Sequence, residues 1–359
     1  MSKNKNFFQI EDKKIGEDYP TYFIADIAAS HDGEINRAID LIYLCAEKGA
    51  DAAKFQHFQA ETIVSDFGFK NLGSKMSHQS SWKKSVFDTY ADASLPFEWT
   101  EKLKKAADDA GIHFFTSPYS FELVDKVDKY VCAYKIGSGD ITWHKIIEHM
   151  AKKGKPYILA TGASSIDDVK NAVEESLKIN DNFCLMQCNT NYTASLENFG
   201  FINLNVLKQY RDIFPSVVLG LSDHTPGHTT VLGAVSLGAR VIEKHFTDDN
   251  YREGPDHLFS MNPKSWEEMV LATRDLELSL GDGKKIVENN EKDTVVVQRR
   301  AIRATRDLES GYIISESDLF PLRPCPVDGI EPYHEKDLIG KKINRAIPKG
   351  DIIRWKDLS

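Results

Sequence analysis

The chain has 359 residues, of which 41% are apolar and 28% are charged, and its formal net charge is −9 at neutral pH. This length fits one large α/β domain with a small one, or two medium domains, and the apolar fraction suffices for a sizeable core. The acidic balance argues against nucleic acid as the main partner, because phosphate backbones require a basic face, but a small anionic substrate needs only a local group of Lys and Arg.

The chain begins with a charged segment, "MSKNKNFFQIEDKK", that lacks the apolar core of a signal peptide. No apolar run in the sequence approaches the length of a membrane span, so we expect no membrane partner. Five cysteines are scattered along the chain, and the closest pair, Cys184 and Cys188, would lie about 13 Å apart along a strand, too far to share a metal or form a disulfide. We therefore expect reduced cysteines in a cytoplasmic protein.

From residue 22 onward, short β-rich runs alternate with longer amphipathic runs. Strands are expected at 22–28, 51–57, 112–118, 132–138, 156–162, 182–189, 216–222 and 240–246, with helices such as 35–49, 97–110, 143–153, 165–179 and 226–238 between them. Repeated alternation of this kind predicts a parallel sheet, and eight units is the number that closes a (β/α)₈ TIM barrel. A doubly wound open sheet is the alternative, but no glycine-rich turn follows the first strand.

The second strand–helix unit carries an insertion. About forty residues, from Phe58 to Pro96, separate strand 51–57 from its helix, and they are polar with scattered aromatic side chains. An insertion at a loop that follows a barrel strand lies over the active-site face. We therefore expect this segment to form a wall or lid of the pocket.

The pattern changes after Gly281, which divides the chain into two expected domains. Residues 1–283 form the predicted barrel, residues 284–297 a charged linker, and residues 298–359 a small domain of short β-like runs between turns. A domain of about sixty residues has a marginal core, so we expect it to pack against another part of the protein.

Two lysines, Lys54 and Lys135, lie within strands expected to be buried. The C-terminal ends of barrel strands line one shared mouth. Burying an ammonium group without a partner costs several kcal/mol, so each lysine is expected to have a binding or structural role. Together with Ser138 and backbone donors from nearby glycines, the two lysines suit a multiply charged anion such as a phosphate ester. The alternative is a structural pair of each lysine with a Glu or Asp inside the barrel.

The stretch "GLSDHTPGHTT", residues 220–230, holds His224 and His228 four residues apart. Two histidines at that spacing on one helix can share a metal. Pro226 and Gly227 lie between them, however, and a helix does not readily run through that pair. The sequence therefore gives His228 no assigned role.

His224 and His245 follow or end adjacent expected strands, which lie about 5 Å apart. Their imidazoles can converge on one cation, with Asp223 and Glu243 nearby. Each histidine alone could equally be a hydrogen-bonded core residue. Two imidazoles with carboxylates or water suit Mn²⁺, with Mg²⁺, Co²⁺ or Zn²⁺ as alternatives, and open positions would allow Lewis-acid chemistry on a carbonyl group.

The order of the motifs resembles the sialic acid synthase family. The segments that carry the resemblance are "KFQ", "YKIGSGD", "ATG", "GLSDHT", "EKHFT", "GPDHLFSMNP" and the C-terminal "LRPCPVDGIEP…LIGKKINRAIPKGD". They span nearly the whole chain, and the small terminal domain is similar to the antifreeze-like (SAF) domain of those enzymes. The resemblance implies N-acetylneuraminate, legionaminate or pseudaminate synthase chemistry. Phosphoenolpyruvate condenses with an aldose such as N-acetylmannosamine, giving a nine-carbon 2-keto-3-deoxy acid and phosphate.

The resemblance also implies roles for individual residues. It places Lys54, Lys135 and Ser138 at phosphoenolpyruvate and Ser222 at the phosphate region. It places Gln56, Tyr192 and Asp256 on the sugar side. The ends of two expected strands add Thr161 and Thr190. The implied site is therefore catalytic Asp26, Lys54, Lys135 and His245, metal ligands His224 and His245, and substrate-binding Gln56, Ser138, Thr161, Thr190, Tyr192, Ser222, Asp256 and Arg323.

Arg323, in "LRP", matches the arginine that the terminal domain of one subunit inserts into its partner's active site in that family. The resemblance therefore implies a domain-swapped homodimer in which Arg323 acts in trans. Such an arrangement also explains why so small a domain need not be stable alone.

The sequence departs from the family pattern around the pocket. Asp26 stands where a glutamate is usual, Ala160 replaces a serine, and Gln187, Asn189 and Thr193 replace a histidine, a threonine and a proline. These changes leave the sugar unspecified. A condensing synthase for another aldose or a sugar phosphate, and a non-catalytic sugar-binding barrel, are the competing hypotheses. No basic cluster beyond Lys54, Lys135 and Arg323 stands out, which favours a sugar without phosphate.

Overall fold

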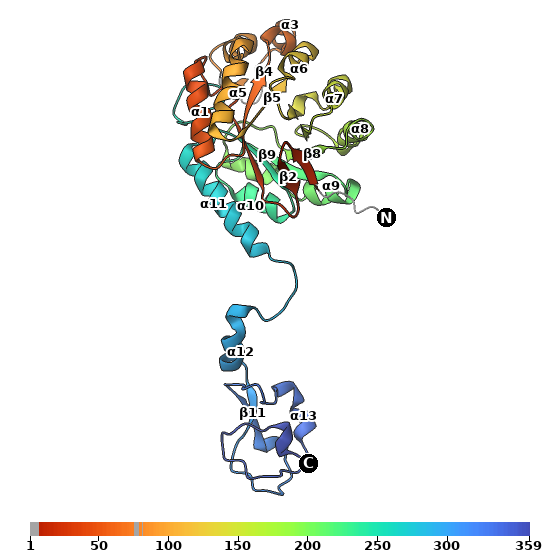
Figure 1. Cartoon of the computed structure of the whole chain (residues 1–359), viewed down its shortest axis with the longest axis vertical. Coiled ribbons are helices and arrows are strands. Elements are labelled where there is room, and N and C mark those ends of the chain that lie inside the picture. The colour runs from red at the N-terminus through yellow and green to blue at the C-terminus, as the bar shows by residue number, and fades with distance from the viewer. Residues whose placement is uncertain (1–6, 75–78, 81) are drawn as a thin grey trace. The chain divides into compact units, whose positions relative to one another are not determined.

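The computed structural model describes residues 7–74, 79–80 and 82–359. The chain forms two compact units, Met1–Gly281 and Asp282–Ser359 (Figure 1). Each unit has its own hydrophobic core. No helix among the described residues is long and apolar enough to cross a membrane.

The first unit is built on a closed barrel of eight parallel strands, with the order β10-β3-β4-β5-β6-β7-β8-β9. The eight predicted strands and the predicted TIM-type fold are therefore confirmed. Their side chains are almost all buried on both faces, which is the pattern of a parallel sheet covered by helices. The strands are β3 (Tyr22–Asp26), β4 (Ala52–His57), β5 (His113–Pro118), β6 (Tyr134–Ile136), β7 (Tyr157–Ala160), β8 (Phe183–Cys188), β9 (Val218–Asp223) and β10 (Val241–His245).

Helices surround the barrel (Figure 1). The five expected helices are present with trimmed ends, and α6, α9 and α11 add to them. Each long helix turns one apolar stripe toward the strands, as the buried residues of α1, Ala38, Leu41, Ile42 and Cys45, show. The helices are α1 (Ile35–Glu47), α5 (Thr100–Ala110), α6 (Phe121–Val127), α7 (His144–Ala151), α8 (Ile166–Leu177), α9 (Val206–Ile213), α10 (Thr229–Ser236) and α11 (Pro263–Leu280), with short 3₁₀ turns η3 (Ser138–Asp140) and η4 (Leu196–Phe201).

A hairpin that the sequence analysis missed, β1 (Phe7–Ile10) and β2 (Lys13–Gly16), lies at the N-terminal end of the barrel. The Gln9 amide donates to Asn182 Oδ1 at 3.0 Å, immediately before β8, and Lys13 pairs with Asp51 at 2.6 Å, immediately before β4. The hairpin therefore covers the end opposite the strand C-termini and leaves the functional face open.

The insertion after β4 folds into α2 (Ala60–Ile63), α3 (Asp66–Asn71) and α4 (Val86–Ala93), followed by η2 (Phe97–Trp99). Residues 75–78 and 81 of this predicted wall lie outside the described residues. Side chains of the insertion, among them Phe58, Trp82 and Tyr90, line the large cavity of the barrel. The expectation that the insertion walls the pocket is thus met by its described part.

The second unit has a small antiparallel pair, β11 (Ala301–Ala304) and β12 (Leu319–Leu322), with short turns around it. Most of the segment predicted as a linker is ordered as η5 (Asn289–Glu291) and α12 (Lys292–Gln298). The remaining elements are η6 (Glu316–Asp318), η7 (Pro332–His334), α13 (Glu335–Leu338) and η8 (Trp355–Asp357). Buried aliphatic residues, mostly isoleucines such as Ile302 and Ile353, form its core.

Candidate active site

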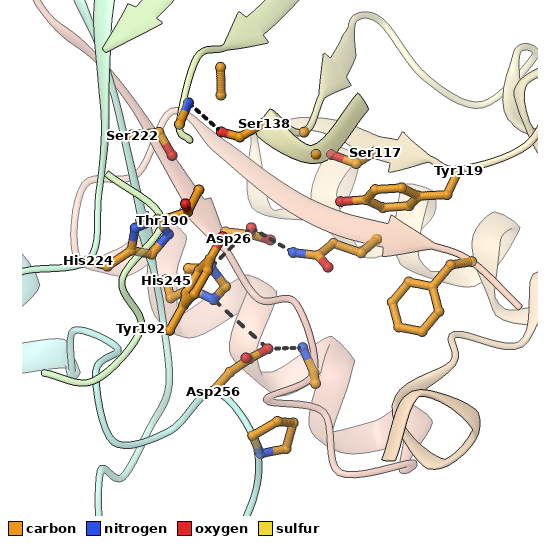
Figure 2. Close-up of a pocket in the computed structure, with 18 of the residues that line it drawn as sticks. Asp26, Ser117, Tyr119, Ser138, Thr190, Tyr192, Ser222, His224, His245 and Asp256 are labelled. Atoms are coloured by element: carbon orange, nitrogen blue, oxygen red, sulfur yellow. Dashed lines mark hydrogen bonds and ion pairs between the residues drawn. The ribbon is translucent and has the colours of Figure 1, made fainter. Parts of the chain in front are cut away.

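A cavity of about 670 Å³ opens where the C-terminal ends of the barrel strands meet. Every strand contributes, as the geometry of a parallel barrel requires. Figure 2 shows the side chains converging from the strands toward one space. The predicted residues that line it are Asp26, Lys54, Gln56, Lys135, Ser138, Thr190, Tyr192, Ser222, His224, His245 and Asp256.

Thr161 is the one predicted residue of the first unit that does not line this cavity. Its hydroxyl donates to the Met186 carbonyl oxygen at 2.9 Å and accepts from the Tyr210 hydroxyl at 2.9 Å. The reason is the alternation of side chains along an extended chain. Ala160 and Gly162 face the cavity, so Thr161 between them faces the barrel wall. The structure therefore corrects its assignment as a substrate contact.

The floor of the cavity is a buried network of lysines and carboxylates. Lys54 Nζ lies 2.5 Å from Asp26 Oδ2 and 3.5 Å from Glu243 Oε1. Lys135 Nζ lies 3.1 Å from the same Glu243 oxygen, which also accepts from the Ser222 hydroxyl at 3.2 Å. The other oxygen, Glu243 Oε2, is buried and has no hydrogen-bond partner among the described residues. Both lysines thus have acidic partners and both face the cavity.

Glu243 is the central acid of this network. Burial opposes its ionisation, but the Lys135 and Lys54 ammonium groups outweigh that penalty and lower the pKa of Glu243 to about 2. In the same way, the carboxylates of Asp26 and Glu243 overcome burial and raise the pKa of Lys54. From the sequence, Glu243 is expected only as a carboxylate near the His224 and His245 imidazoles. Glu243 lies two positions before His245 on one strand and therefore faces the same side, which is the signal that could have found it.

Gly162, at the end of the β7 strand, brings two hydroxyl side chains close together. Its amide donates to Ser138 Oγ at 2.9 Å. A Cβ atom added at Gly162 would lie 2.3 Å from Thr190 Cγ2 and 2.9 Å from Ser138 Oγ, so no other residue fits without displacing them. The glycine thus allows the Ser138 hydroxyl, which its amide holds, and the Thr190 side chain to form a compact cradle in the cavity lining.

The His224 and His245 rings lie side by side at the cavity edge, with centroids 5.4 Å apart. His224 Nδ1 lies 2.9 Å from the carbonyl oxygen of Asn189, which can only accept, so Nδ1 carries the proton and the Nε2 lone pair is free. His245 Nδ1 is buried without a hydrogen-bond partner among the described residues and lies 3.9 Å from Asp256 Oδ2. Burial lowers the pKa of both histidines to about 3, so both rings are neutral at pH 7.

This donor pair fits a divalent cation. Two neutral imidazoles with available nitrogen lone pairs suit Mn²⁺ or a similar ion, and the orphaned His245 Nδ1 has no other use in the described structure. Among the described residues, no group of three or more His, Cys, Asp and Glu side chains is arranged to hold a metal. A cation here would therefore keep positions for substrate or water. His228 lies at the start of α10, half-buried, and does not line the cavity.

The sugar side predicted from the sequence is marked by Tyr192, Gln56 and Asp256. Tyr192 packs against His224 with ring centroids 4.2 Å apart. Gln56 Nε2 donates to Asp26 Oδ2 at 3.0 Å. Asp256 extends over the edge of the cavity, and burial raises its pKa to about 6. Tyr192 and Asp256 lie next to the imidazole pair (Figure 2), and together with Gln56 they form a polar rim of the cavity.

The cavity also has an aromatic wall, whose residues could not be named from the sequence. The Phe58 ring lies 5.4 Å from Tyr90 and 6.1 Å from Tyr119, and Trp82 lies 6.1 Å from Tyr90. Ser117, from the β5 strand, also lines the cavity and was not predicted. Only the polar "TSP" at that strand end pointed to it, and such a short tag does not specify a role.

Arg323, the remaining predicted residue, belongs to the second unit. It follows β12 directly and is exposed. No described residue forms a hydrogen bond or ion pair with its guanidinium group. Its predicted role at the active site of a partner subunit therefore stays a prediction.

Comparisons with known proteins match both units. A profile described as the NeuB family matches residues 41–285, and one described as the SAF domain matches residues 299–359. An uncharacterized Methanocaldococcus jannaschii protein, MJ1065, is 35% identical over 98% of both chains. N,N'-diacetyllegionaminic acid synthase of Legionella pneumophila is 32% identical over 100% of this chain and 99% of its own. The crystal structure of an N-acetylneuraminic acid synthetase from Leptospira borgpetersenii aligns with a TM-score of 0.70 and 26% identity, over 81% of this chain and 96% of that one.

Proposed function

This chain belongs to the NeuB family, and from that premise we propose that it is a nonulosonic acid synthase. It would be a transferase that condenses phosphoenolpyruvate with an aldose such as N-acetylmannosamine or a related amino or deoxy sugar. One observation carries the proposal. Two buried lysines and a cradle that presents the Ser138 hydroxyl lie in one cavity with two neutral imidazoles.

The lysines and the cradle supply an anion site. Lys54 and Lys135 both contact one Glu243 oxygen, so their ammonium groups are already oriented toward a single point in the cavity. The carboxylate and phosphate of phosphoenolpyruvate would offer the same kind of acceptor, with Ser138 and Ser222 adding hydroxyl donors. Charge-assisted hydrogen bonds of this kind are stronger than neutral ones. Held in place, the substrate meets the aldose in a reactive orientation, which lowers the barrier.

His224 and His245 would hold a divalent ion, Mn²⁺ in the first instance and Mg²⁺ or Co²⁺ as alternatives. Such an ion, when bound, supplies Lewis-acid polarisation of the aldehyde oxygen. The chain's own contribution is orientation. The hydrogen bond of His224 Nδ1 to Asn189 fixes that ring, and contact with Tyr192 restricts it further.

The proposed reaction forms a carbon–carbon bond and a C2–O bond to water, and it breaks the C2–O bond to phosphate. C3 of phosphoenolpyruvate attacks the aldehyde carbon, and the aldehyde oxygen takes a proton to become a hydroxyl group. Water adds at the cationic C2 and gives up one proton. The C2–O bond to phosphate then breaks, the new C2 hydroxyl becomes the keto group, and its proton leaves with the inorganic phosphate. We assign the acceptance of that water's proton to Asp26, a carboxylate that lines the cavity and whose Oδ2 lies 3.6 Å from His245 Nε2.

The lining of the cavity favours an aldose without a phosphate group. Lys54 and Lys135 are the only Lys or Arg side chains among the described lining residues, and both are in contact with carboxylates. Asp140 and Asp256 add acidic groups elsewhere in the lining, and burial raises the pKa of each to about 6. At neutral pH both are largely ionised and would repel a sugar phosphate. We therefore expect N-acetylmannosamine-like sugars to react faster than their phosphate esters.

The proposal is tested by phosphate release from phosphoenolpyruvate. The assay compares N-acyl hexosamines, plain hexoses and hexose phosphates, each with Mn²⁺ and after chelation. Release that requires both an N-acylated, unphosphorylated sugar and the metal supports the proposal as stated. Release with another aldose alone would identify a related condensing synthase. No release with any sugar, combined with measurable sugar binding, would indicate a non-catalytic barrel.

Gly162→Ala is expected to raise the KM for phosphoenolpyruvate about tenfold or more. The added methyl group would collide with Thr190 and Ser138, and displacement of the Ser138 hydroxyl would remove its hydrogen bond to the anion. Gly200→Ala is the matched control, because a Cβ atom there meets no atom within 4 Å. Steady-state kinetics with both substrates checks this. An unchanged KM for phosphoenolpyruvate in the Gly162 variant would show that the cradle does not contribute to the anion site.

Arg323→Ala is expected to raise the KM for the aldose much more than the KM for phosphoenolpyruvate. The reason is the proposed domain-swapped homodimer, in which this exposed guanidinium reaches the sugar side of a partner's cavity. Mixed dimers of Arg323→Ala with His245→Ala should regain activity, because one of the two sites then has both residues intact. Mixed dimers that stay inactive after confirmed subunit exchange would count against action in trans.

A further inference from the structure

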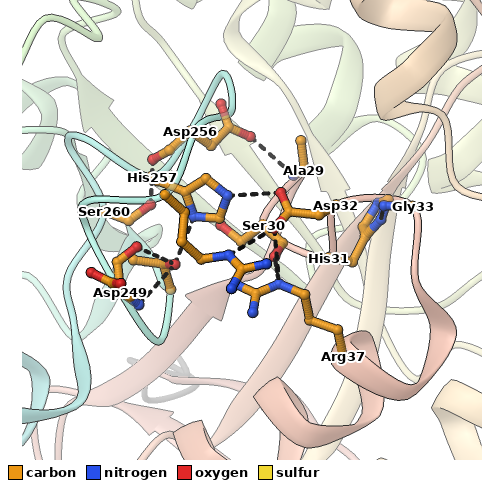
Figure 3. Close-up of polar contacts among 12 residues, drawn as sticks. Ala29, Ser30, His31, Asp32, Gly33, Arg37, Asp249, Asp256, His257 and Ser260 are labelled. Atoms are coloured by element: carbon orange, nitrogen blue, oxygen red, sulfur yellow. Dashed lines mark hydrogen bonds and ion pairs between the residues drawn. The ribbon is translucent and has the colours of Figure 1, made fainter.

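Two loops meet beside the sugar side of the cavity, and a buried histidine joins them. Residues 27–34 connect β3 to α1, and residues 246–262 connect β10 to α11. His257 of the second loop is fully buried. Its Nε2 lies 2.8 Å from Asp32 Oδ1 of the first loop, and its Nδ1 lies 2.7 Å from Thr247 Oγ1. Both ring nitrogens are thus engaged, which fixes the position and orientation of the ring (Figure 3).

Asp32 is held by more than this histidine. Its second oxygen accepts from Arg252 Nε at 2.9 Å and lies 3.1 Å from Arg37 Nε. Arg37 also makes two hydrogen bonds to Asp248. The Asp32 side chain is only 22% exposed, so these contacts are partly shielded from water. The second loop is therefore held at two separate points, by Asp32 of the first loop and by Arg37 at the start of α1.

The residue before His257 is Asp256, which lines the cavity. Its Oδ2 accepts from the Ala29 amide of the first loop at 3.0 Å, and its backbone oxygen accepts from Ser260 Oγ at 2.6 Å. The same Oδ2 lies 3.9 Å from His245 Nδ1. Because Asp256 and His257 are consecutive, the position of the His257 ring also sets where the Asp256 carboxylate enters the cavity.

We propose that Asp32 and His257 are positioning residues for Asp256 and thereby determine affinity for the aldose. Neither side chain lines the cavity, so neither is a catalytic residue. The inference rests on the proposed function for the identity of the substrate. It goes beyond that function by naming a contact between two loops that controls one side of the site.

The loop sequence leaves room for this contact. A Cβ atom at Gly254 would lie 2.6 Å from His257 Cδ2, inside the ring's own space. Asp32 has φ 51°, a left-handed conformation that Asp and Asn tolerate better than most residues. Asn is therefore a suitable replacement at position 32, since it keeps the backbone and the shape and removes the charge.

The test uses a pair of replacements at His257 that separate its two nitrogens. The amide of Asn reaches about as far as Nδ1, so His257→Asn keeps the contact with Thr247 and loses the one with Asp32. The amide of Gln reaches about as far as Nε2, so His257→Gln retains a donor to Asp32. We expect His257→Asn to raise the aldose KM about tenfold, with the KM for phosphoenolpyruvate within about twofold of wild type, and His257→Gln to restore most of the affinity. Asp32→Asn should have a smaller effect of the same kind.

Asp248→Ala is the matched control, because it breaks a charged contact of the same loop that does not involve His257. The combination of His257→Asn with Asp256→Ala should be no worse than Asp256→Ala alone, since the two act through one carboxylate. Equal losses for both substrates, fully additive losses, or the same loss in Asp248→Ala would each overturn the inference.

A second readout does not depend on activity. Hydrogen–deuterium exchange of the segment around Ala29 reports its hydrogen bond to Asp256. Exchange there should accelerate in His257→Asn and stay at the wild-type rate in His257→Gln and Asp248→Ala. If wild type releases no phosphate with any sugar, the proposed function fails, and this exchange pattern still decides whether the loop contact positions Asp256. Unchanged exchange in His257→Asn would contradict the positioning role directly.

Discussion

His245→Ala is expected to abolish phosphate release, with a loss of about three orders of magnitude or more in kcat, and to weaken Mn²⁺ binding. The residue combines two roles in the proposed mechanism, as a metal ligand and as a neighbour of Asp26. Its pKa is lowered to about 3 by burial, so it is available as a neutral ligand at pH 7. Among the described residues, no set of three or more His, Cys, Asp and Glu side chains is arranged to hold a metal, so we expect no compensation for the lost imidazole.

His228→Ala is the matched control, since it also removes one imidazole from the segment around β9. His228 lies at the start of α10 and does not line the cavity. Its replacement should leave Mn²⁺ affinity and kcat near their wild-type values. Calorimetry with Mn²⁺ on both variants, alongside phosphate release, separates binding from turnover. Loss of the metal in His228→Ala would refute the pairing of His224 with His245 across neighbouring strands.

That pairing could be predicted because barrel geometry is regular. In the structure Lys244 of β10 lies opposite Asp223 of β9 in the register of the sheet. The residues that follow them, His245 and His224, are therefore neighbours. Lys54 and Lys135 were accessible to the same reasoning, as charged residues in buried strands. Thr161 shows where the reasoning failed. It was chosen with its motif "ATG", whereas alternation along the chain points it away from Ala160 and Gly162.

Other parts of the site could not be predicted because they depend on contacts between distant loops. His257 and Asp32 lie 225 residues apart in sequence, and no local pattern indicates that they touch. The aromatic wall of Phe58, Trp82 and Tyr90 comes from an irregular insertion without a periodic pattern. The β1–β2 hairpin was missed for a related reason, since strands of four residues each give too short a pattern to recognise.

The two hypotheses for the lysines turn out to be compatible. A structural pair with an acid was the alternative to an anion site, and Lys135 indeed contacts Glu243. Yet this carboxylate also lines the cavity, and one of its oxygens lacks a hydrogen-bond partner among the described residues. An acid in that position neutralises the lysines in the absence of substrate. It also keeps them at the cavity surface, where an incoming anion can reach them.

Lys135→Met is therefore expected to lower kcat/KM for phosphoenolpyruvate by about two to three orders of magnitude. Methionine keeps much of the side-chain length and removes the charge that would stabilise the phosphate and carboxylate. The protein should stay folded, because Glu243 retains Lys54 at 3.5 Å and the Ser222 hydroxyl at 3.2 Å. Kinetics with varied phosphoenolpyruvate at saturating sugar measures the loss, and thermal unfolding of the same sample confirms the fold.

Lys244→Met provides the contrast, because Lys244 is another buried lysine in an ion pair, with Asp223, but does not line the cavity. Its removal leaves Asp223 buried with only two threonine hydroxyls and backbone groups, which should cost about 3 kcal/mol of stability or more. The KM for phosphoenolpyruvate should nevertheless stay close to wild type in any folded protein that remains. If both variants raised that KM equally, the effect of Lys135 would come from the stability of the barrel. If only Lys135→Met raises it, the ammonium group acts on the substrate anion itself.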